Sequence, residues 1–146
     1  MDSGERQFLD IERGNIRRTL ELLSEARARP EISRLEWIAI VTLLQNLYSG
    51  VENVLRFVLQ SRGVKVQHSG SWHKDLLVAA RKNGLVTDET AAGLLRLLLF
   101  RHVHIHGYSH SLDPARIEPL ASNAPALVQR FLAEMESLEL GPGRKD

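Results

Sequence analysis

Cysteine is absent from this chain of 146 residues. Disulfides and thiolate metal sites are therefore excluded, and the composition is compatible with a reducing compartment, so we expect a cytoplasmic protein. Aromatic side chains make up only 5% of the residues, which requires a mostly aliphatic core. No apolar run is long enough to cross a bilayer, and the charged N-terminus "MDSGERQFLDIERG" predicts no signal peptide.

The chain also has no marked excess of positive or negative charge, because 19 basic and 18 acidic residues leave a net charge of only +1. A broad basic surface for duplex nucleic acid is not expected, so any contact with nucleic acid must come from a local cluster. Hydrophobic residues reach 43%, which excludes general disorder. The length suits one domain, which we expect over residues 1–140, followed by a flexible tail, "GPGRKD", at residues 141–146.

The apolar residues recur at helical spacing, and no run of alternating strands is found. We predict an all-α fold, an antiparallel bundle of four to five helices. The expected helices cover residues 5–27, 34–62, 72–84, 89–107 and 113–138.

The first two predicted helices carry the clearest stripes. In the second, Ser33 and Glu36 form a potential capping box at the start. A continuous seam of residues at spacings of four and three follows the capping box. Such seams occur in helix packing inside one chain or between two chains. Because aromatic residues are few, we expect one chain to bury its helices incompletely alone and to form a two-fold dimer. The first stripe is Leu9, Ile16, Leu20 and Leu23, and the seam is Trp37, Val41, Leu44, Tyr48, Val51, Leu55 and Val58.

Glycine and proline mark the expected ends of the helices. Gly63, Gly84 and Gly107 are predicted to stop the second, third and fourth helices, because glycine readily adopts the left-handed conformation of a helix cap. Pro119 and Pro125 are predicted to bend or restart the last one.

Four of the six histidines lie in the segment "FRHVHIHGYSH", residues 100–110. Metal binding is one interpretation. On a strand, His102, His104 and His106 would alternate onto one face, whereas on a helix His102 and His106 would share a face as a pair of ligands. The preceding leucine-rich segment favours the helix and weakens the metal interpretation. A second interpretation is ordinary packing and surface decoration, which suits His104 or His110 alone.

Cleavage of an RNA phosphodiester is the third interpretation. RNA carries its own nucleophile, the 2′-hydroxyl, so a protein needs only proton transfer and charge stabilisation. An imidazole can move the proton, a guanidinium matches a phosphate group, and no metal is required. Arg101 and His106 would lie about 140° apart around a regular helix, and a second subunit would supply the missing acid or base.

The segment "RHVHIHGY" resembles the R-x4-H-x-Y motif of HepT-like proteins, a branch of the HEPN superfamily. Arg101, His106 and Tyr108 match the arginine, histidine and tyrosine of that motif. The segments "LYSGVENVLRFVLQSRGV" and "SGSWHKDLL" are similar to the second helix and the following Trp-His segment of this family. In many HEPN ribonucleases the residue directly after the arginine is polar, often asparagine. This sequence departs from that pattern, because it has His102 at this position.

The resemblance implies a homodimer with the motif-bearing helices near the two-fold axis. It implies a metal-independent endoribonuclease toxin without a cofactor, in which Arg101 and His106 are catalytic and Tyr108 lines the cleft and supports the site. His102, at the position of the departure, either supports the site by orienting it or joins the chemistry. The implied partners are an RNA substrate and a minimal nucleotidyltransferase (MntA-like) antitoxin, which transfers AMP to Tyr108. The alternative is a non-catalytic helical partner that only binds and regulates a nucleotidyltransferase.

Four further residues have a structural interpretation that we favour over a functional one. Tyr48 and Glu52, one turn apart, are interpreted as a bundle tyrosine and a solvated glutamate. Trp72 and His73 are interpreted as a packing aromatic and a capping or surface histidine.

Overall fold

The computed structural model describes residues 2–66, 71–106 and 112–139, and the side chains of these residues except those of 102–106. The described residues form five helices and no strand, which confirms the all-α prediction. They are α1 (Ser3–Arg27), α2 (Arg34–Ser61), α3 (Trp72–Lys82), α4 (Asp88–His106) and α5 (Pro114–Glu139). None of the helices in the described part of the chain has the length and apolar character that a membrane crossing needs.

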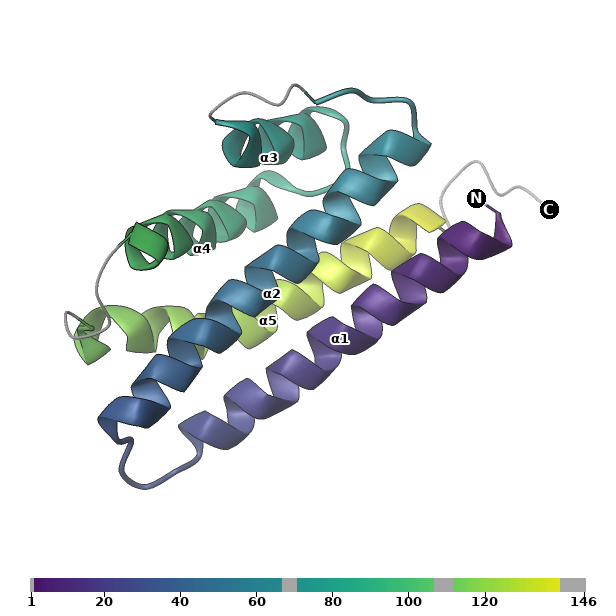
Figure 1. The fold of residues 1–146 in the computed structure, drawn as a ribbon. Coiled ribbons are helices and arrows are strands. Elements are labelled where there is room, and N and C mark those ends of the chain that lie inside the picture. The colour runs from purple at the N-terminus through teal and green to yellow at the C-terminus, as the bar shows by residue number, and fades with distance from the viewer. Residues whose placement is uncertain (1, 67–70, 107–111, 140–146) are drawn as a thin grey trace.

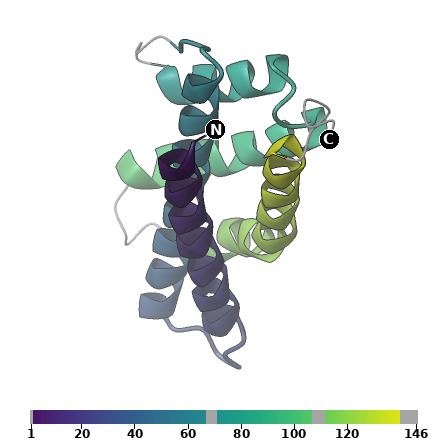
Figure 2. The ribbon, with the colours of Figure 1, turned by 90° about the vertical axis from the view of Figure 1, so that its right-hand side faces the viewer.

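Helix α2 lies at the centre of the bundle and packs against each of the other four helices. Helices α1 and α2 run antiparallel, as do α4 and α5, so the antiparallel prediction is confirmed (Figure 1). Figure 2 shows α1 and α5 beside each other, and the shorter helices α3 and α4 pack on another side of α2.

Local signals set the helix ends much as the sequence predicts. Ser33 accepts a hydrogen bond from the backbone N–H of Glu36, and the Glu36 carboxylate accepts one from the backbone N–H of Ser33, which completes the capping box. These contacts hold the pKa of the Glu36 carboxyl below its usual value. Gly63 and Gly84 follow α2 and α3 with φ of 74° and 71°, a conformation that favours glycine.

The apolar stripes of α1 and α2 pack against each other and against α5 inside a single chain. All four residues of the α1 stripe are buried, and so is the α2 seam except for the half-buried Trp37. The expectation that one chain buries its helices incompletely alone is therefore wrong for this seam. Since α2 contacts helices on several sides, its apolar face has partners within the chain.

Helix α5 continues through both Pro119 and Pro125, so the predicted restart is wrong, whereas nothing contradicts the bend that the sequence predicted as the alternative. Each proline removes one backbone hydrogen bond, which weakens a helix. The helix buries eight side chains against the core, and this packing outweighs the local cost. The predicted stop at Gly107 and the predicted tail at residues 141–146 lie outside the described residues.

Phe131 is the largest side chain that α5 buries completely. We predict that Phe131→Ala lowers the free energy of unfolding by about 3–5 kcal/mol, because it removes a buried ring and leaves a cavity. Leu35→Ala, at a residue that is 77% exposed, should change it by less than about 0.5 kcal/mol. Urea unfolding followed by circular dichroism measures both values, and equal losses would contradict this account of the core.

Candidate active site

Arg101 lies near the C-terminal end of α4, on the face that this helix turns toward the core. Leu94 and Leu97 precede it at spacings of seven and four residues, and both are buried. The side chain of Arg101 is 21% exposed, so its guanidinium lies at the boundary between the core and the surface.

Glu52 of α2 is the acidic partner of Arg101. Its Oε1 accepts a hydrogen bond from Nη1 of Arg101 at 2.9 Å. Only 3% of Glu52 is exposed, although charged residues are rarely buried unless they are paired. The contact therefore joins α2 to α4 through a largely desolvated ion pair, and it fixes where the guanidinium lies.

His73, in the first turn of α3, contacts the second oxygen of the same carboxylate. Its Nδ1 lies 2.5 Å from Oε2 of Glu52. The imidazole is 34% exposed, and its centroid lies 3.8 Å from that of the Trp72 ring. Arg56 lies on α2, the helix that carries Glu52, and its Cζ is 5.4 Å from the centroid of the Trp72 ring.

Tyr48 forms the floor of this cluster, one helical turn before Glu52. Its ring is fully buried, and Cζ of Arg101 lies 5.9 Å from the ring centroid. Burial and the negative charge of Glu52 raise the pKa of the Tyr48 phenol well above its usual value, while Arg101 acts in the opposite direction. The phenol is therefore neutral at physiological pH and cannot serve there as a base.

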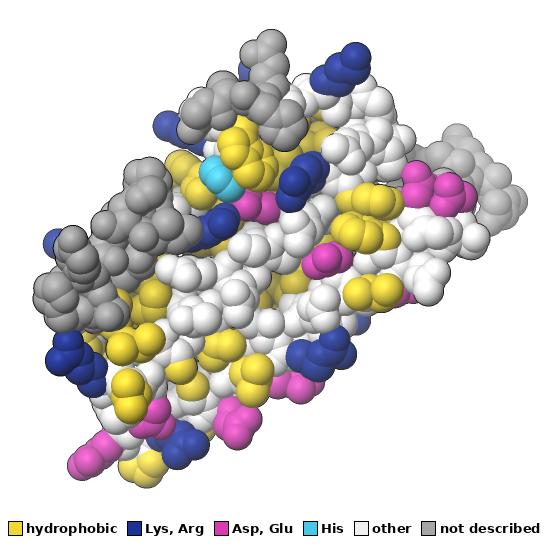
Figure 3. Space-filling view, viewed as in Figure 1, with side chains coloured by type: hydrophobic (Ala, Val, Ile, Leu, Met, Phe, Trp, Pro, Cys, Tyr) yellow, Lys and Arg dark blue, Asp and Glu magenta, His cyan; other side chains and the backbone are white. Residues whose placement is uncertain are grey.

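Three helices meet in this arrangement, which we call the Glu52 cluster: Tyr48, Glu52, His73 and Arg101. Figure 3 shows a histidine at the surface near basic, acidic and hydrophobic side chains on the α2–α3–α4 side of the molecule. A partly exposed guanidinium can bind an anion, and a partly exposed imidazole can transfer a proton. A buried carboxylate orients both groups, so the cluster has the parts for acid–base chemistry on a phosphate ester.

The structure describes the predicted motif residues to different extents. It brings Arg101 into the Glu52 cluster. His102 and His106 belong to α4, which continues as a helix to His106, but their side chains are not described. Tyr108 lies outside the described residues.

The strand interpretation of the histidine segment is wrong, because α4 contains His102, His104 and His106 in helical conformation. Alternate residues of a helix do not share a face. Among the described side chains, no group of three potential ligands could hold a metal ion.

Two structural interpretations of the sequence are also wrong. Glu52 is not solvated, and His73 is a half-buried partner of Glu52, neither a cap nor a free surface residue. The signal for Glu52 was present in the sequence, because it follows Tyr48 by four residues and precedes Leu55 by three. A glutamate on a buried face requires a positively charged or hydrogen-bonding partner.

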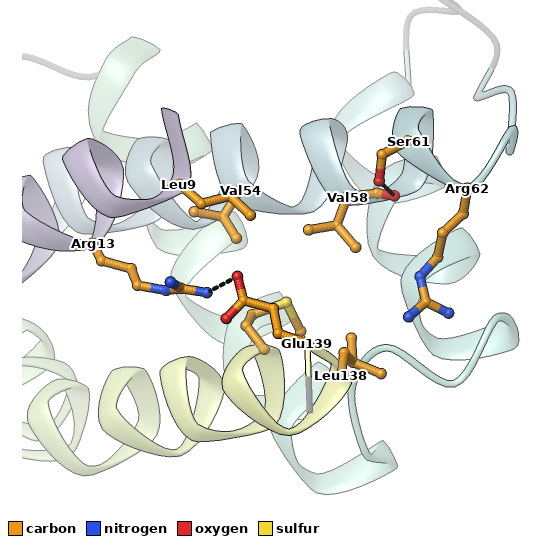
Figure 4. A pocket seen from close by; sticks show the side chains of 9 residues that line it. Leu9, Arg13, Val54, Val58, Ser61, Arg62, Leu138 and Glu139 are labelled. Carbon is orange, nitrogen blue, oxygen red and sulfur yellow. Dashed lines mark hydrogen bonds and ion pairs between the residues drawn. The ribbon is translucent and has the colours of Figure 1, made fainter. Parts of the chain in front are cut away.

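A second charged cluster lies away from the first, where α1, α2 and the end of α5 meet (Figure 4). Nη2 of Arg13 bonds Oε1 of Glu139 at 2.8 Å, and Nη1 bonds Asp10 at 3.2 Å. Arg62 projects from the end of α2 beside the same pocket. The two carboxylates already neutralise the buried Arg13, so this cluster links α1 to the end of α5.

One comparison with known proteins gave a match, and it agrees with the helical fold. Residues 39–140, more than half of the chain, match the family model described as HepT-like protein. The chain therefore belongs to the HepT-like family of the HEPN superfamily. No curated protein and no solved structure gave a match. The matched segment contains all four residues of the Glu52 cluster.

The burial of Glu52 leads to a prediction for its partner. Arg101→Ala should lower the free energy of unfolding by about 1–3 kcal/mol, because it leaves one oxygen of a buried carboxylate without its cation. Arg130 provides the matched control, since it bonds Glu89 at 2.7 Å with both side chains well exposed. Arg130→Ala should cost less than about 1 kcal/mol in urea unfolding. A smaller loss for Arg101→Ala than for Arg130→Ala would contradict the structural role of the Glu52 pair.

Proposed function

We propose that this chain is a metal-independent endoribonuclease that acts as the toxin of a HepT/MntA-type toxin–antitoxin pair. The family relates the chain to HEPN-type toxins, and the HEPN superfamily is generally associated with ribonuclease activity. The observation that carries the proposal is the contact of Arg101 with Glu52, which holds a guanidinium at the surface in a defined place.

The chemistry needs only side chains of the motif. Arg101 binds the scissile phosphate and stabilises the charge that develops on its oxygens. The 2′-oxygen of RNA loses its proton and bonds to phosphorus, the bond from phosphorus to the 5′-oxygen breaks, and that oxygen gains a proton. His106 carries one of these two proton transfers, and His102 supports the site. The products are a 2′,3′-cyclic phosphate and a 5′-hydroxyl.

The proposed toxin acts in the cytoplasm as a two-fold dimer, with the Arg101 and His106 residues of both subunits near a shared cleft. Helix α4, which carries Arg101 and His106, supports this arrangement. Two residues before Arg101, and directly after the buried Leu98, the side chain of Leu99 is 55% exposed. An exposed leucine on the motif-bearing helix suits a contact between subunits.

The proposed control acts on Tyr108, two residues beyond His106. A minimal nucleotidyltransferase antitoxin would transfer AMP from ATP to the phenol, whose oxygen bonds to the α-phosphorus as pyrophosphate leaves and the phenolic proton is lost. The added phosphodiester brings a negative charge and an adenosine close to the RNA phosphate site, where they repel and obstruct the substrate.

The nuclease activity is tested with a purified chain and single-stranded RNA. We expect cleavage that persists in EDTA and leaves 2′,3′-cyclic phosphate ends. His106→Ala should reduce the rate at least ~10²-fold, and Arg101→Ala should reduce it to a similar extent. Circular dichroism controls for folding of each variant, and Arg130→Ala should cleave like the wild type. A requirement for added zinc or manganese would refute the proposed mechanism.

Modification is tested by intact-mass analysis after incubation with a minimal nucleotidyltransferase, ATP and magnesium. The wild type should gain the mass of AMP and lose nuclease activity, while its helix content stays the same. Tyr108→Phe should retain much of the activity and show neither the mass gain nor the inhibition. Tight binding of the two proteins without mass gain or RNA cleavage would instead identify a non-catalytic partner of the transferase.

A further inference from the structure

The Glu52 cluster pairs a histidine outside the R-x4-H-x-Y motif with the arginine of that motif. Nδ1 of His73 and Nη1 of Arg101 contact the two oxygens of one carboxylate, at 2.5 and 2.9 Å. The shared carboxylate therefore brings the imidazole of His73 and the guanidinium of Arg101 to the same place, where one phosphate ester could meet both groups. Because His73 is 34% exposed, a ligand at the surface can reach its ring.

The carboxylate also determines which nitrogen of His73 can act. An ionised carboxylate only accepts hydrogen bonds, so Nδ1 of His73 carries the hydrogen that it donates to Glu52. In the neutral imidazole, Nε2 then holds a lone pair and can accept a proton. A carboxylate at Nδ1 keeps the ring in this tautomer and stabilises the imidazolium that forms, as in the histidine–carboxylate pairs of hydrolases.

Neighbouring groups restrict the imidazole further. The Trp72 ring lies against it at 3.8 Å between centroids, with an angle of 31° between the planes. Glu52 of α2 contacts the imidazole, and Arg101 of α4 contacts the same carboxylate. Arg56 of α2 lies over the Trp72 ring. Two cations and one carboxylate suit a site that receives a negatively charged phosphodiester.

We propose that His73 is the general base of the RNA cleavage described above, an inference that rests on the proposed function. Nε2 of His73 removes the proton of the 2′-hydroxyl, and the 2′-oxygen bonds to phosphorus. The bond from phosphorus to the 5′-oxygen breaks, and His106 donates a proton to that oxygen. Glu52 is the positioning residue that orients both His73 and Arg101.

Two variants of His73 separate a base from a merely structural residue. His73→Ala removes both the hydrogen bond to Glu52 and the proton acceptor. His73→Asn retains an N–H donor that can reach Glu52 from about the position of Nδ1, but it has no group that accepts a proton at physiological pH. We expect both variants to lose at least ~10²-fold in the rate of RNA cleavage. Lys74→Ala, at the exposed neighbouring position of α3, should retain the wild-type rate.

An activated substrate separates the base from the acid. A nucleoside 3′-(4-nitrophenyl phosphate) cyclises by the same attack of its 2′-hydroxyl, but its leaving group departs without a proton. His106→Ala, which lacks the acid, should therefore recover most of its activity on this substrate relative to RNA. His73→Asn, which lacks the base, should remain at least ~10²-fold slower than the wild type on both substrates.

The outcomes distinguish this inference from the proposed function. If the wild type cleaves RNA and His73→Asn cleaves it at a similar rate, His73 only positions Glu52 and the base assignment is wrong. If His73→Asn recovers on the activated substrate and His106→Ala does not, the two roles are reversed and the assignment is equally wrong. If the wild type cleaves neither substrate, the proposed function fails, and the base assignment fails with it.

Discussion

The buried carboxylate of Glu52 is the constraint on which the arrangement of the candidate site depends. A charged group that is only 3% exposed has lost most of its hydration, and it is stable only when other groups bond both of its oxygens. Arg101 supplies one partner from α4 and His73 supplies the other from α3. The same contacts that stabilise the charge therefore fix the relative positions of three helices and hold the guanidinium and the imidazole where both are partly exposed.

The rest of the bundle provides the rigid support for this constraint. Helix α2 packs against each of the other four described helices, and the fully buried ring of Tyr48 lies under the guanidinium of Arg101. Close-packed interiors resist small displacements, so Glu52 has little freedom to move away from its partners. With few aromatic residues in the chain, the aliphatic side chains of α1, α2 and α5 provide most of this packing.

Family membership and geometry contribute different parts of the functional argument. The HepT-like match shows the family, whereas the contacts of Glu52 connect Arg101 of α4 to His73 of α3. An arginine alone can bind a phosphate, but cleavage also requires proton transfer. The carboxylate of Glu52 links the guanidinium of Arg101 to the imidazole of His73. This link gives the proposed nuclease a candidate general base, His73, in addition to the motif histidine.

The sequence by itself determined the features that depend on near neighbours. Helical periodicity predicted four to five helices, the Ser33–Glu36 pair predicted the start of α2, and Gly63 and Gly84 predicted two ends, because these signals act within a few residues. Only the tertiary structure decided the surroundings of Glu52, whose partners lie 21 and 49 residues along the chain. It also decided that α5 continues through two prolines. Local spacing indicates which face of a helix is buried, but it carries no information about which residues of distant segments meet there.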